Sequence, residues 1–189
     1  MNSFDNSPFT GSLQENERSS GGKIFLIGFM GSGKTYWGSR WAEQYDLPFI
    51  DLDKLVEQRE NKSITALFEE NGEEYFRKVE ASCLKTFSGK QSFIMACGGG
   101  APCFNNNMQW MNEQGTTVYL SAAPQFLCER LMDEKDRRPL LKNLAPTELL
   151  SFIEKKLNER EPVYQQAKII LPAEALNDKS LSSFLIFNS

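Results

Sequence analysis

The stretch Lys23-Ile-Phe-Leu-Ile-Gly-Phe-Met-Gly-Ser-Gly-Lys-Thr35 decides the fold, because a short apolar run leads directly into the pattern G-x-x-x-x-G-K-T. The apolar residues predict a buried β-strand. The loop after it must turn successive backbone N–H groups towards an anion, and Gly28, Gly31 and Gly33 allow this because glycine adopts positive φ freely. An ordinary glycine turn is the alternative. The strand before the loop and the helix after it, whose N-terminus points at the anion, favour a phosphate-binding loop.

Two side chains at the end of this loop indicate the ligand. Lys34 can reach the terminal phosphates of a nucleoside triphosphate, and the Thr35 hydroxyl is placed to bind Mg²⁺. We therefore expect the nucleotide to be bound by Gly31, Ser32, Gly33, Lys34, Thr35 and Tyr36.

The composition limits the remaining possibilities. A chain of 189 residues with 40% apolar content is long enough to bury the core of one domain, and we expect it to act as a monomer. A net charge of −4 gives no basic surface for nucleic acid, and no apolar run reaches the ~18 residues needed to cross a membrane. The absence of histidine excludes Ser–His and Cys–His catalytic groups, so proton transfer falls to carboxylates, lysine or water. The cysteines lack metal-ligand spacing, and we expect free thiols in a cytoplasmic protein at Cys83, Cys97, Cys103 and Cys128.

The chain divides into a polar start and one domain. Residues 1–22 are rich in serine, asparagine and glycine, so we expect a disordered N-terminal extension before a domain over residues 23–189. Within the domain, short apolar runs alternate with helical stretches. Such strands need crossover connections, which favour a mostly parallel sheet with helices on both faces. We predict a three-layer α/β fold with strands at Ile24–Ile27, Phe49–Leu52, Ser92–Ala96, Thr117–Leu120 and Lys168–Leu171.

Three helical features follow from apolar spacing. Trp37 and Trp41, four residues apart on the first helix, are expected to pack in the core. A further helix is predicted over Glu73–Lys85, and the run Leu181–Phe187 predicts a closing helix.

Ligands of an open parallel sheet bind beyond the carboxyl ends of its strands, so the residues after each strand are candidates for a site. Asp51 and Asp53 follow the second strand, and Gly98–Gly100 follow the third. Three consecutive glycines forfeit strand and helix stability, which indicates a close approach to their backbone. Two charged positions further along complete the set, namely Arg77 and Arg160.

Taken singly, these positions have ordinary explanations. Asp53 can cap a helix over Lys54–Glu60, Arg77 can be a solvated helix charge, and the charged run Asp133–Arg138 can be a surface loop.

Together, the motifs resemble those of the shikimate kinase family over residues 23 to about 171. The matching motifs are G-F-M-G-S-G-K-T at 28–35, D-x-D at 51–53, Phe76-Arg77, G-G-G at 98–100, R-P-L at 138–140 and R-x-P-x-Y at 160–164. The resemblance implies ATP-dependent phosphorylation of the 3-hydroxyl of shikimate in aromatic amino-acid biosynthesis. It also implies a P-loop kinase fold, with a five-stranded parallel sheet in the order 2-3-1-4-5 and a lid at about 130–145.

The resemblance further implies a role for each acceptor-side residue. Asp53 would hold the reacting hydroxyl, and Arg77 and Arg160 would bind the shikimate carboxylate. The glycines that would pass beneath the substrate are Gly98, Gly99 and Gly100.

On the nucleotide side, Lys34 and Arg138 would place positive charge on the transferring phosphoryl group, and Arg130 would stack on adenine. Asp51 would support the Mg²⁺ shell through water, beside Thr35.

Two positions depart from the family pattern. Cys97 stands where relatives usually carry a hydroxyl residue, so a hydrogen bond near Mg²⁺ would be missing or replaced by water. The run Ile169–Pro172 ends the last strand where an Asp-Thr type ending is common, which leaves the adenine-side loop unmapped.

Other classes of protein fit the sequence less well. Another small-molecule or nucleoside monophosphate kinase of this architecture would share Lys34 and Thr35, but it need not pair two arginines with D-x-D. A GTP-dependent switch needs an N-K-x-D motif after a strand, and Asn61-Lys62-Ser-Ile is misplaced and lacks the acid. A non-catalytic protein on this fold would be expected to have lost phosphate or acceptor residues, and none is missing.

Overall fold

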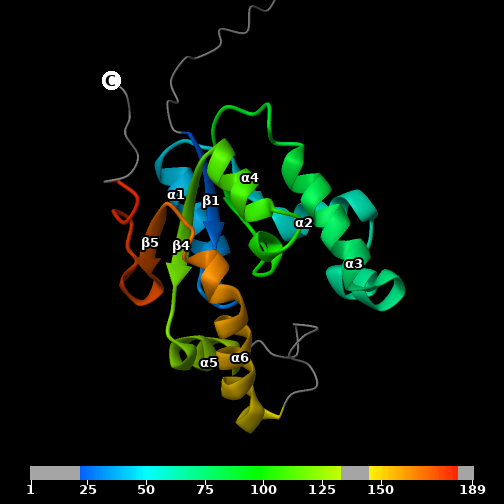
Figure 1. Cartoon of the computed structure of the whole chain (residues 1–189). Coiled ribbons are helices and arrows are strands. Elements are labelled where there is room, and N and C mark those ends of the chain that lie inside the picture. The colour runs from blue at the N-terminus through cyan, green and yellow to red at the C-terminus, as the bar shows by residue number, and fades with distance from the viewer. Residues whose placement is uncertain (1–21, 133–144, 183–189) are drawn as a thin grey trace, which may run out of the picture.

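The structure is a computed structural model that describes residues 22–132 and 145–182 (Figure 1). One sheet of parallel strands runs through it in the order β2-β3-β1-β4-β5, which confirms the expected topology. The strands are β1 (Lys23–Ile27), β2 (Phe49–Asp51), β3 (Phe93–Ala96), β4 (Thr116–Ser121) and β5 (Ile169–Pro172). Ile24 of β1 lies in register with Ile94 of β3 and with Thr116 of β4, so β1 and its loop stand at the centre of the sheet.

Helices cover both faces, because alternate side chains of each strand point to opposite sides of the sheet. Phe25 and Ile27 of β1 belong to one apolar cluster, and Ile24 and Leu26 belong to the other. The helices are α1 (Lys34–Gln44), α2 (Leu52–Glu60), α3 (Ile64–Lys85), α4 (Asn107–Gln114), α5 (Pro124–Met132) and α6 (Pro146–Tyr164), with short 3₁₀ turns η1 (Ala101–Cys103) and η3 (Ala173–Ala175).

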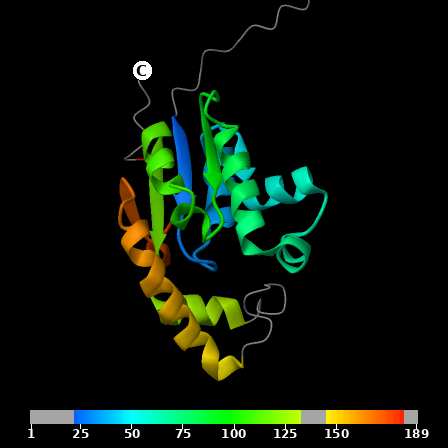
Figure 2. The same cartoon turned by 45° about the vertical axis from the view of Figure 1, so that its right-hand side comes forward.

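The two clusters differ in what covers them. Residues of α2, α3, α4, α5 and α6 pack on the first, whereas α1 and the segment after β5 pack on the second. Figure 2 shows α5 and the first turns of α6 beyond the carboxyl end of β4, on the side where the loop after β1 lies. The three-layer prediction is confirmed, and the loop ends of the strands gather at one edge.

Two helices begin earlier than predicted. α3 starts at Ile64 rather than Glu73, with non-helical backbone at Gly72 (φ 79°, ψ 171°) where two helical parts meet in a kink. α2 starts at Leu52, and its N-cap is Asp51, whose carboxylate accepts a 3.2 Å hydrogen bond from Lys54 N. The alternative in which Asp53 caps a helix from Lys54 is therefore wrong.

The predicted core residues on α1 are partly confirmed. Trp41 is fully buried, and its indole donates a hydrogen bond to Asn177 O. Trp37 is only half-buried and stacks on Trp41 with ring centroids 5.5 Å apart. The four cysteines are unpaired, as expected.

Several expectations lie outside the described residues. They concern the extension over residues 1–21, the lid with Arg138 between residues 133 and 144, and the closing helix beyond residue 182. Among the helices that the structure does describe, none combines the length and apolar character needed to cross a bilayer.

Candidate active site

The loop after β1 has the conformation that its glycines predict. Gly28, Gly31 and Gly33 have φ of 138°, 83° and 92°, in the region that favours glycine. A Cβ on Gly28 would lie 2.7 Å from Leu120 O, so the loop can approach β4 this closely only because Gly28 has no side chain. Ser32 is buried within it, and its Oγ has no hydrogen-bond partner among the described residues. The Ser32 side chain is therefore enclosed by the loop and does not line the cavity beside it.

Lys34 lies over the loop backbone. Its Nζ donates hydrogen bonds of 2.9 Å to Gly28 O and 2.8 Å to Phe29 O. The positive charge is thus held at the loop itself, beside the N-terminus of α1.

Thr35 and Asp51 are the two residues that the sequence analysis expected at a Mg²⁺ site. The Thr35 hydroxyl donates a 3.0 Å hydrogen bond to Asp51 Oδ2, which brings the ends of β2 and the loop together. Within the described residues, no group of three or more Cys, Asp or Glu could form a closed metal site. Mg²⁺ at nucleotide sites uses one or two protein oxygens and completes its shell with phosphate and water, so this pair fits Mg²⁺.

Two cavities open along the carboxyl edge of the sheet. The larger, about 370 Å³, is lined by the phosphate loop with Lys34, Thr35 and Asp51. The smaller, about 120 Å³, is lined by Arg77, Glu80 and Arg160. The residues that line both cavities are Met30, Asp53, Gly98 and Gly99. A group bound in one cavity therefore meets a group bound in the other at a shared wall.

Asp53 belongs to that shared wall. Its side chain is exposed to the cavity, yet protein surrounds it on the other sides. This desolvation, together with the Asp51 carboxylate, raises the pKa of Asp53, and the cations of Lys34 and Arg77 oppose the rise. Asp53 is thus a carboxylate between two cavities and two cations, which suits an acceptor of a hydroxyl proton.

Arg77 is buried, with only 8% of its side chain exposed, so the interpretation as a solvated helix charge is wrong. Its Nη1 lies 2.9 Å from Glu80 Oε2 and its Nη2 lies 3.0 Å from Glu73 Oε1. Burial raises the pKa of Glu80 to about 7, and the Arg77 guanidinium opposes this rise. Glu80 lines the smaller cavity, and sequence reasoning missed it, although its position three residues after Arg77 on a helix was a usable signal.

The three glycines after β3 fit between the charged side chains. A Cβ on Gly98 would lie 2.6 Å from Asp53 Oδ1 and 2.9 Å from Glu80 Oε1, and one on Gly100 would overlap Arg77 Nη2. The close approach that the triple glycine predicted is therefore an approach of side chains to this backbone.

Arg160 reaches the same place from α6. Its guanidinium carbon lies 5.6 Å from the centre of the Phe29 ring, and its Nη1 is buried without a hydrogen-bond partner in the part of the chain described. A Cβ on Gly99 would lie 3.5 Å from that Nη1, and the Tyr164 hydroxyl donates a 2.5 Å hydrogen bond to Gly99 O. The structure thus brings Arg77 to Gly100 and Arg160 to Gly99, at one cavity.

Arg130 also lines the larger cavity. Its guanidinium carbon is 5.1 Å from the centre of the Phe126 ring, and its Nη1 would be 3.5 Å from a Cβ on Gly33. Tyr36, exposed on α1, lines the same cavity. Both therefore line the cavity at the phosphate loop, whereas Arg138 lies outside the described residues.

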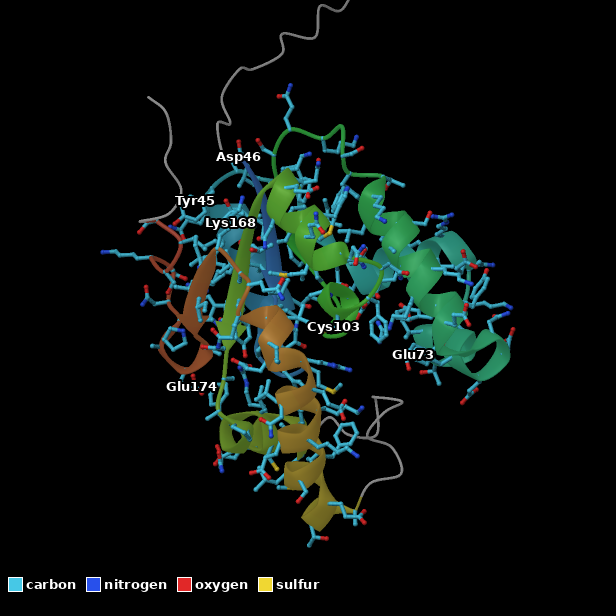
Figure 3. All side chains as sticks on the ribbon, viewed as in Figure 1. Tyr45, Asp46, Glu73, Cys103, Lys168 and Glu174 are labelled. Atoms are coloured by element: carbon cyan, nitrogen blue, oxygen red, sulfur yellow. The ribbon has the colours of Figure 1, made fainter. Side chains whose placement is uncertain are left out.

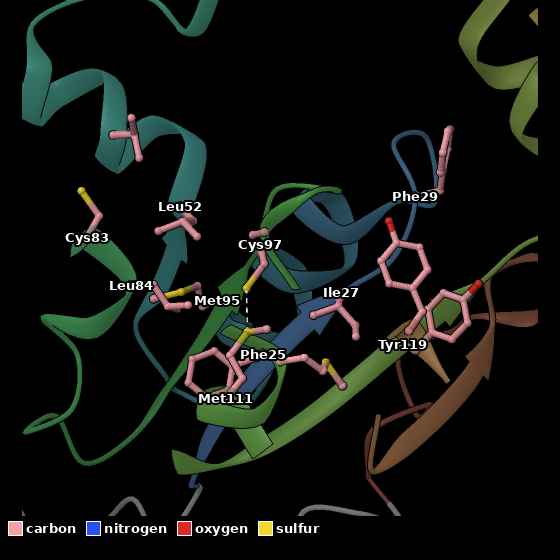
Figure 4. Packing of buried hydrophobic residues seen from close by; sticks show 14 of the residues in the cluster. Phe25, Ile27, Phe29, Leu52, Cys83, Leu84, Met95, Cys97, Met111 and Tyr119 are labelled. Atoms are coloured by element: carbon pink, nitrogen blue, oxygen red, sulfur yellow. Dashed lines mark hydrogen bonds between the residues drawn. The ribbon is translucent and has the colours of Figure 1, made fainter. Parts of the chain in front are cut away.

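Cys97 departs from the family pattern by packing as an apolar residue. It is buried, and its Sγ lies 3.7 Å from Met111 Sδ (Figure 4). Burial raises the pKa of its thiol, so the sulfur stays protonated.

A phosphate loop, an adjoining cavity lined by two arginines and a carboxylate at their junction are typical of a P-loop kinase. A sequence model of the shikimate kinase family matches residues 30–186. The shikimate kinase of Bacteroides fragilis is 44% identical over 158 residues, which cover 84% of this chain and 88% of that protein. The chain therefore belongs to the shikimate kinase family.

Solved structures agree with this assignment. The structure of shikimate kinase from Bacteroides thetaiotaomicron matches with a TM-score of 0.78 at 40% identity, over 86% of this chain and 93% of that chain. Shikimate kinase from Acinetobacter baumannii, solved in complex with shikimate, matches with a TM-score of 0.76 at 29% identity, over 87% of this chain and 90% of that one.

Proposed function

We propose that this chain transfers a phosphoryl group from ATP to the 3-hydroxyl of shikimate. The observation that carries the proposal is the shared wall at Asp53, where the phosphate-loop cavity meets a cavity lined by two arginines. The relative from Acinetobacter baumannii, whose structure holds shikimate, supports this acceptor.

On the nucleotide side, the loop residues and Lys34 would bind the phosphates, and Tyr36 and Arg130 would lie beside the nucleoside. Phosphoryl transfer has a loose transition state with charge on the equatorial oxygens, so positioning and cations contribute more than a strong base. The lack of histidine is then no obstacle. Arg138 is proposed, from the family resemblance, to add positive charge at the same phosphoryl group.

Mg²⁺ would be held by Thr35 and, through water, by Asp51. When bound, it neutralises charge on the phosphates and helps to orient them. The two protein oxygens are already paired at 3.0 Å, which keeps them together for this role.

On the acceptor side, Arg77 and Arg160 would bind the shikimate carboxylate through forked hydrogen bonds. The buried guanidinium of Arg77 and the partly buried one of Arg160 repel each other at one small cavity, and an anion relieves that repulsion. The orphan Nη1 of Arg160 supports this role. The backbone of Gly98–Gly100 would pass beneath the substrate, and Asp53 would orient the hydroxyl and accept its proton late in the transfer.

All proposed contacts come from one chain, so we propose a monomeric enzyme. The use of ATP and four unpaired cysteines support a cytoplasmic location.

The proposal is tested by measuring ATP consumption and product formation with shikimate, gluconate and nucleoside monophosphates as acceptors. Phosphorylation of shikimate alone is expected. Arg77→Lys and Arg160→Lys keep the charge but lose the fork, so each should raise KM for shikimate about 10-fold or more with little change in KM for ATP. Arg40→Lys, on the exposed side of α1, is the matched control and should change neither.

An acceptor analogue without the carboxylate separates the arginine roles from the reaction itself. The parent should use this analogue poorly. Arg77→Ala should lose far less activity with the analogue than with shikimate. Equal use of shikimate and of this analogue by the parent would show that the two arginines do not select the acceptor.

A further inference from the structure

Arg77 is enclosed by a segment from another part of the chain, residues 100–105. Gly100 lies against its Nη2, where a Cβ would overlap. The guanidinium carbon lies 4.5 Å from the centre of the Phe104 ring. Asn105 Nδ2 donates a 2.9 Å hydrogen bond to the backbone oxygen of Arg77. We call residues 100–105 the Arg77 clamp, because they contact the guanidinium and the backbone of the same residue.

The Phe104 ring differs from the other rings near this cation. Phe76 and Phe68, at 4.9 Å and 5.9 Å from the guanidinium carbon, belong to α3 and share an element with Arg77. Phe104 follows η1, on the segment after β3, so its contact with Arg77 joins α3 to a segment that continues from the sheet. Its ring is the closest of the three to the guanidinium carbon, which lies over the ring. Glu73 accepts from Nε and Nη2 of Arg77, and Glu80 accepts from Nη1, so among the described residues one N–H on each Nη is left for a ligand. Two such N–H groups suffice for a forked pair of bonds to a planar carboxylate.

The backbone of the clamp is strained at a defined place. Asn105 and Asn106 have φ of 53° and 58°, so two consecutive non-glycine residues are left-handed. This conformation costs free energy, although asparagine tolerates it better than most residues. Asn106 is the N-cap of α4, and the next residue, Asn107, is buried and donates a 2.9 Å hydrogen bond to Ala101 O. Hydrogen bonds fix this left-handed stretch at Asn105 and at Asn107. In this conformation the Asn105 amide reaches the backbone oxygen of Arg77.

Neither Phe104 nor Asn105 lines the acceptor cavity, whereas Arg77 does. Any effect of Phe104 or Asn105 on the acceptor must therefore pass through Arg77, unlike that of Gly100, which lines the cavity itself. We propose that Phe104 and Asn105 are positioning residues that hold the N–H edge of Arg77 towards the acceptor cavity and so select an acceptor with a planar carboxylate. This inference rests on the proposed function for the identity of that acceptor.

Two variants remove the clamp without removing Arg77. Phe104→Leu keeps an apolar side chain but loses the ring face. Asn105→Gly suits the left-handed backbone and deletes only the amide. Each should raise KM for shikimate about fivefold, the size of one cation–π or hydrogen-bond contribution, with kcat and KM for ATP within about twofold. In an Arg77→Lys background the same changes should raise KM for shikimate by less than about twofold further, because the guanidinium that they position is already gone.

A second measurement needs no acceptor. Hydrogen exchange of the Arg77 Nε–H, assigned by its loss in Arg77→Lys, reports how firmly the guanidinium is held against Glu73, to which Nε donates at 3.2 Å. Both clamp variants should speed this exchange about fivefold or more. Asp46→Gly is the matched control, because Asp46 is also a left-handed non-glycine residue (φ 53°) and lies well apart from Glu73 and Cys103 in Figure 3. It should leave exchange and KM unchanged.

The outcomes separate this inference from the proposed function. Unchanged Nε–H exchange in both clamp variants, or an equal rise in KM with and without Arg77, overturns the clamp. A parent enzyme that does not phosphorylate shikimate refutes the proposed function, and the exchange measurement still decides whether Phe104 and Asn105 position Arg77.

Discussion

Arg77 Nη1 lies 2.9 Å from Glu80 Oε2, and both side chains are buried beside the acceptor cavity. The pair leaves Glu80 Oε1 without a hydrogen-bond partner among the described residues, 2.9 Å from where a Cβ of Gly98 would lie. A buried carboxyl with one unused oxygen favours the protonated form, in spite of the adjacent cation. The charge state of Glu80 therefore changes near neutral pH.

This pair predicts a pH dependence of stability. Burial raises the pKa of Glu80 to about 7 from its ordinary 4.5, so the folded protein binds more protons than the unfolded chain between these values. The contribution of Glu80 to the free energy of unfolding is therefore full below pH 4.5 and is lost as the pH rises through 7, and it is at most about 3 kcal/mol. Glu80→Gln is neutral at every pH and lacks this loss.

Urea unfolding of both proteins between pH 5 and 8 measures the effect. The parent should lose stability relative to Glu80→Gln as the pH rises, while all other titrating groups cancel in the difference. A stability difference between the two proteins that stays constant over this range would mean that Arg77 keeps Glu80 ionised in the folded protein.

Lys34 and Asp53 are expected to act on the chemical step. Lys34→Ala removes the cation over the loop, and Asp53→Asn removes the carboxylate at the junction of the two cavities. Each should lower kcat by at least about 10²-fold, as is usual for a positioned group in phosphoryl or proton transfer. Steady-state kinetics at saturating ATP and shikimate measure this, with Asp46→Asn as the control. Near-normal kcat in Asp53→Asn would leave that residue without a chemical role.

The sheet could be predicted from the sequence because each strand is a short apolar run bounded by a helical stretch. β3 is a fully apolar run and β1 is apolar after Lys23, and the glycines that mark close approach follow their ends. The start of α3 could not be predicted, because Gly72 reads as a helix boundary. The structure instead continues from Ile64 through a kink, with positive φ at Gly72 and open space around it.

Much of the candidate site could also be predicted from the sequence, because the phosphate loop and D-x-D follow strands and the ends of parallel strands meet at one edge of a sheet. The environment of Arg77 could not. That the residue is buried depends on Glu80, on Gly100 and on the Phe104 ring, which meet only in the folded chain. The sequence also left open whether Asp51 or Asp53 caps α2, because the two residues are only two positions apart. The backbone decides between them, since Asp51 has the extended conformation of an N-cap.

Gly100 is expected to be essential for acceptor binding rather than for folding. A Cβ there would overlap Arg77 Nη2, at the end of a side chain already fixed by Glu73 and Glu80. Gly100→Ala should displace the guanidinium and raise KM for shikimate about 10-fold or more, with little change in KM for ATP. Gly89→Ala is the matched control, because nothing lies within 4 Å of a Cβ at that position. Equal kinetics in the two variants would mean that Arg77 moves aside without consequence.

Asp51 has two separable tasks, and one substitution distinguishes them. Its Oδ1 accepts from Lys54 N as the N-cap of α2, and its Oδ2 accepts from the Thr35 hydroxyl at the proposed Mg²⁺ site. Asn caps helices about as well as Asp, so Asp51→Asn should change the free energy of unfolding by less than about 0.5 kcal/mol. It removes the negative charge, however, so the Mg²⁺ concentration for half-maximal activity should rise about 10-fold. Asp51→Ala should lose both tasks and destabilise the protein by about 1 kcal/mol as well. A Mg²⁺ titration of activity together with urea unfolding measures the two effects. If Asp51→Asn needs no more Mg²⁺ than the parent, Asp51 is a helix cap and takes no part in holding the metal.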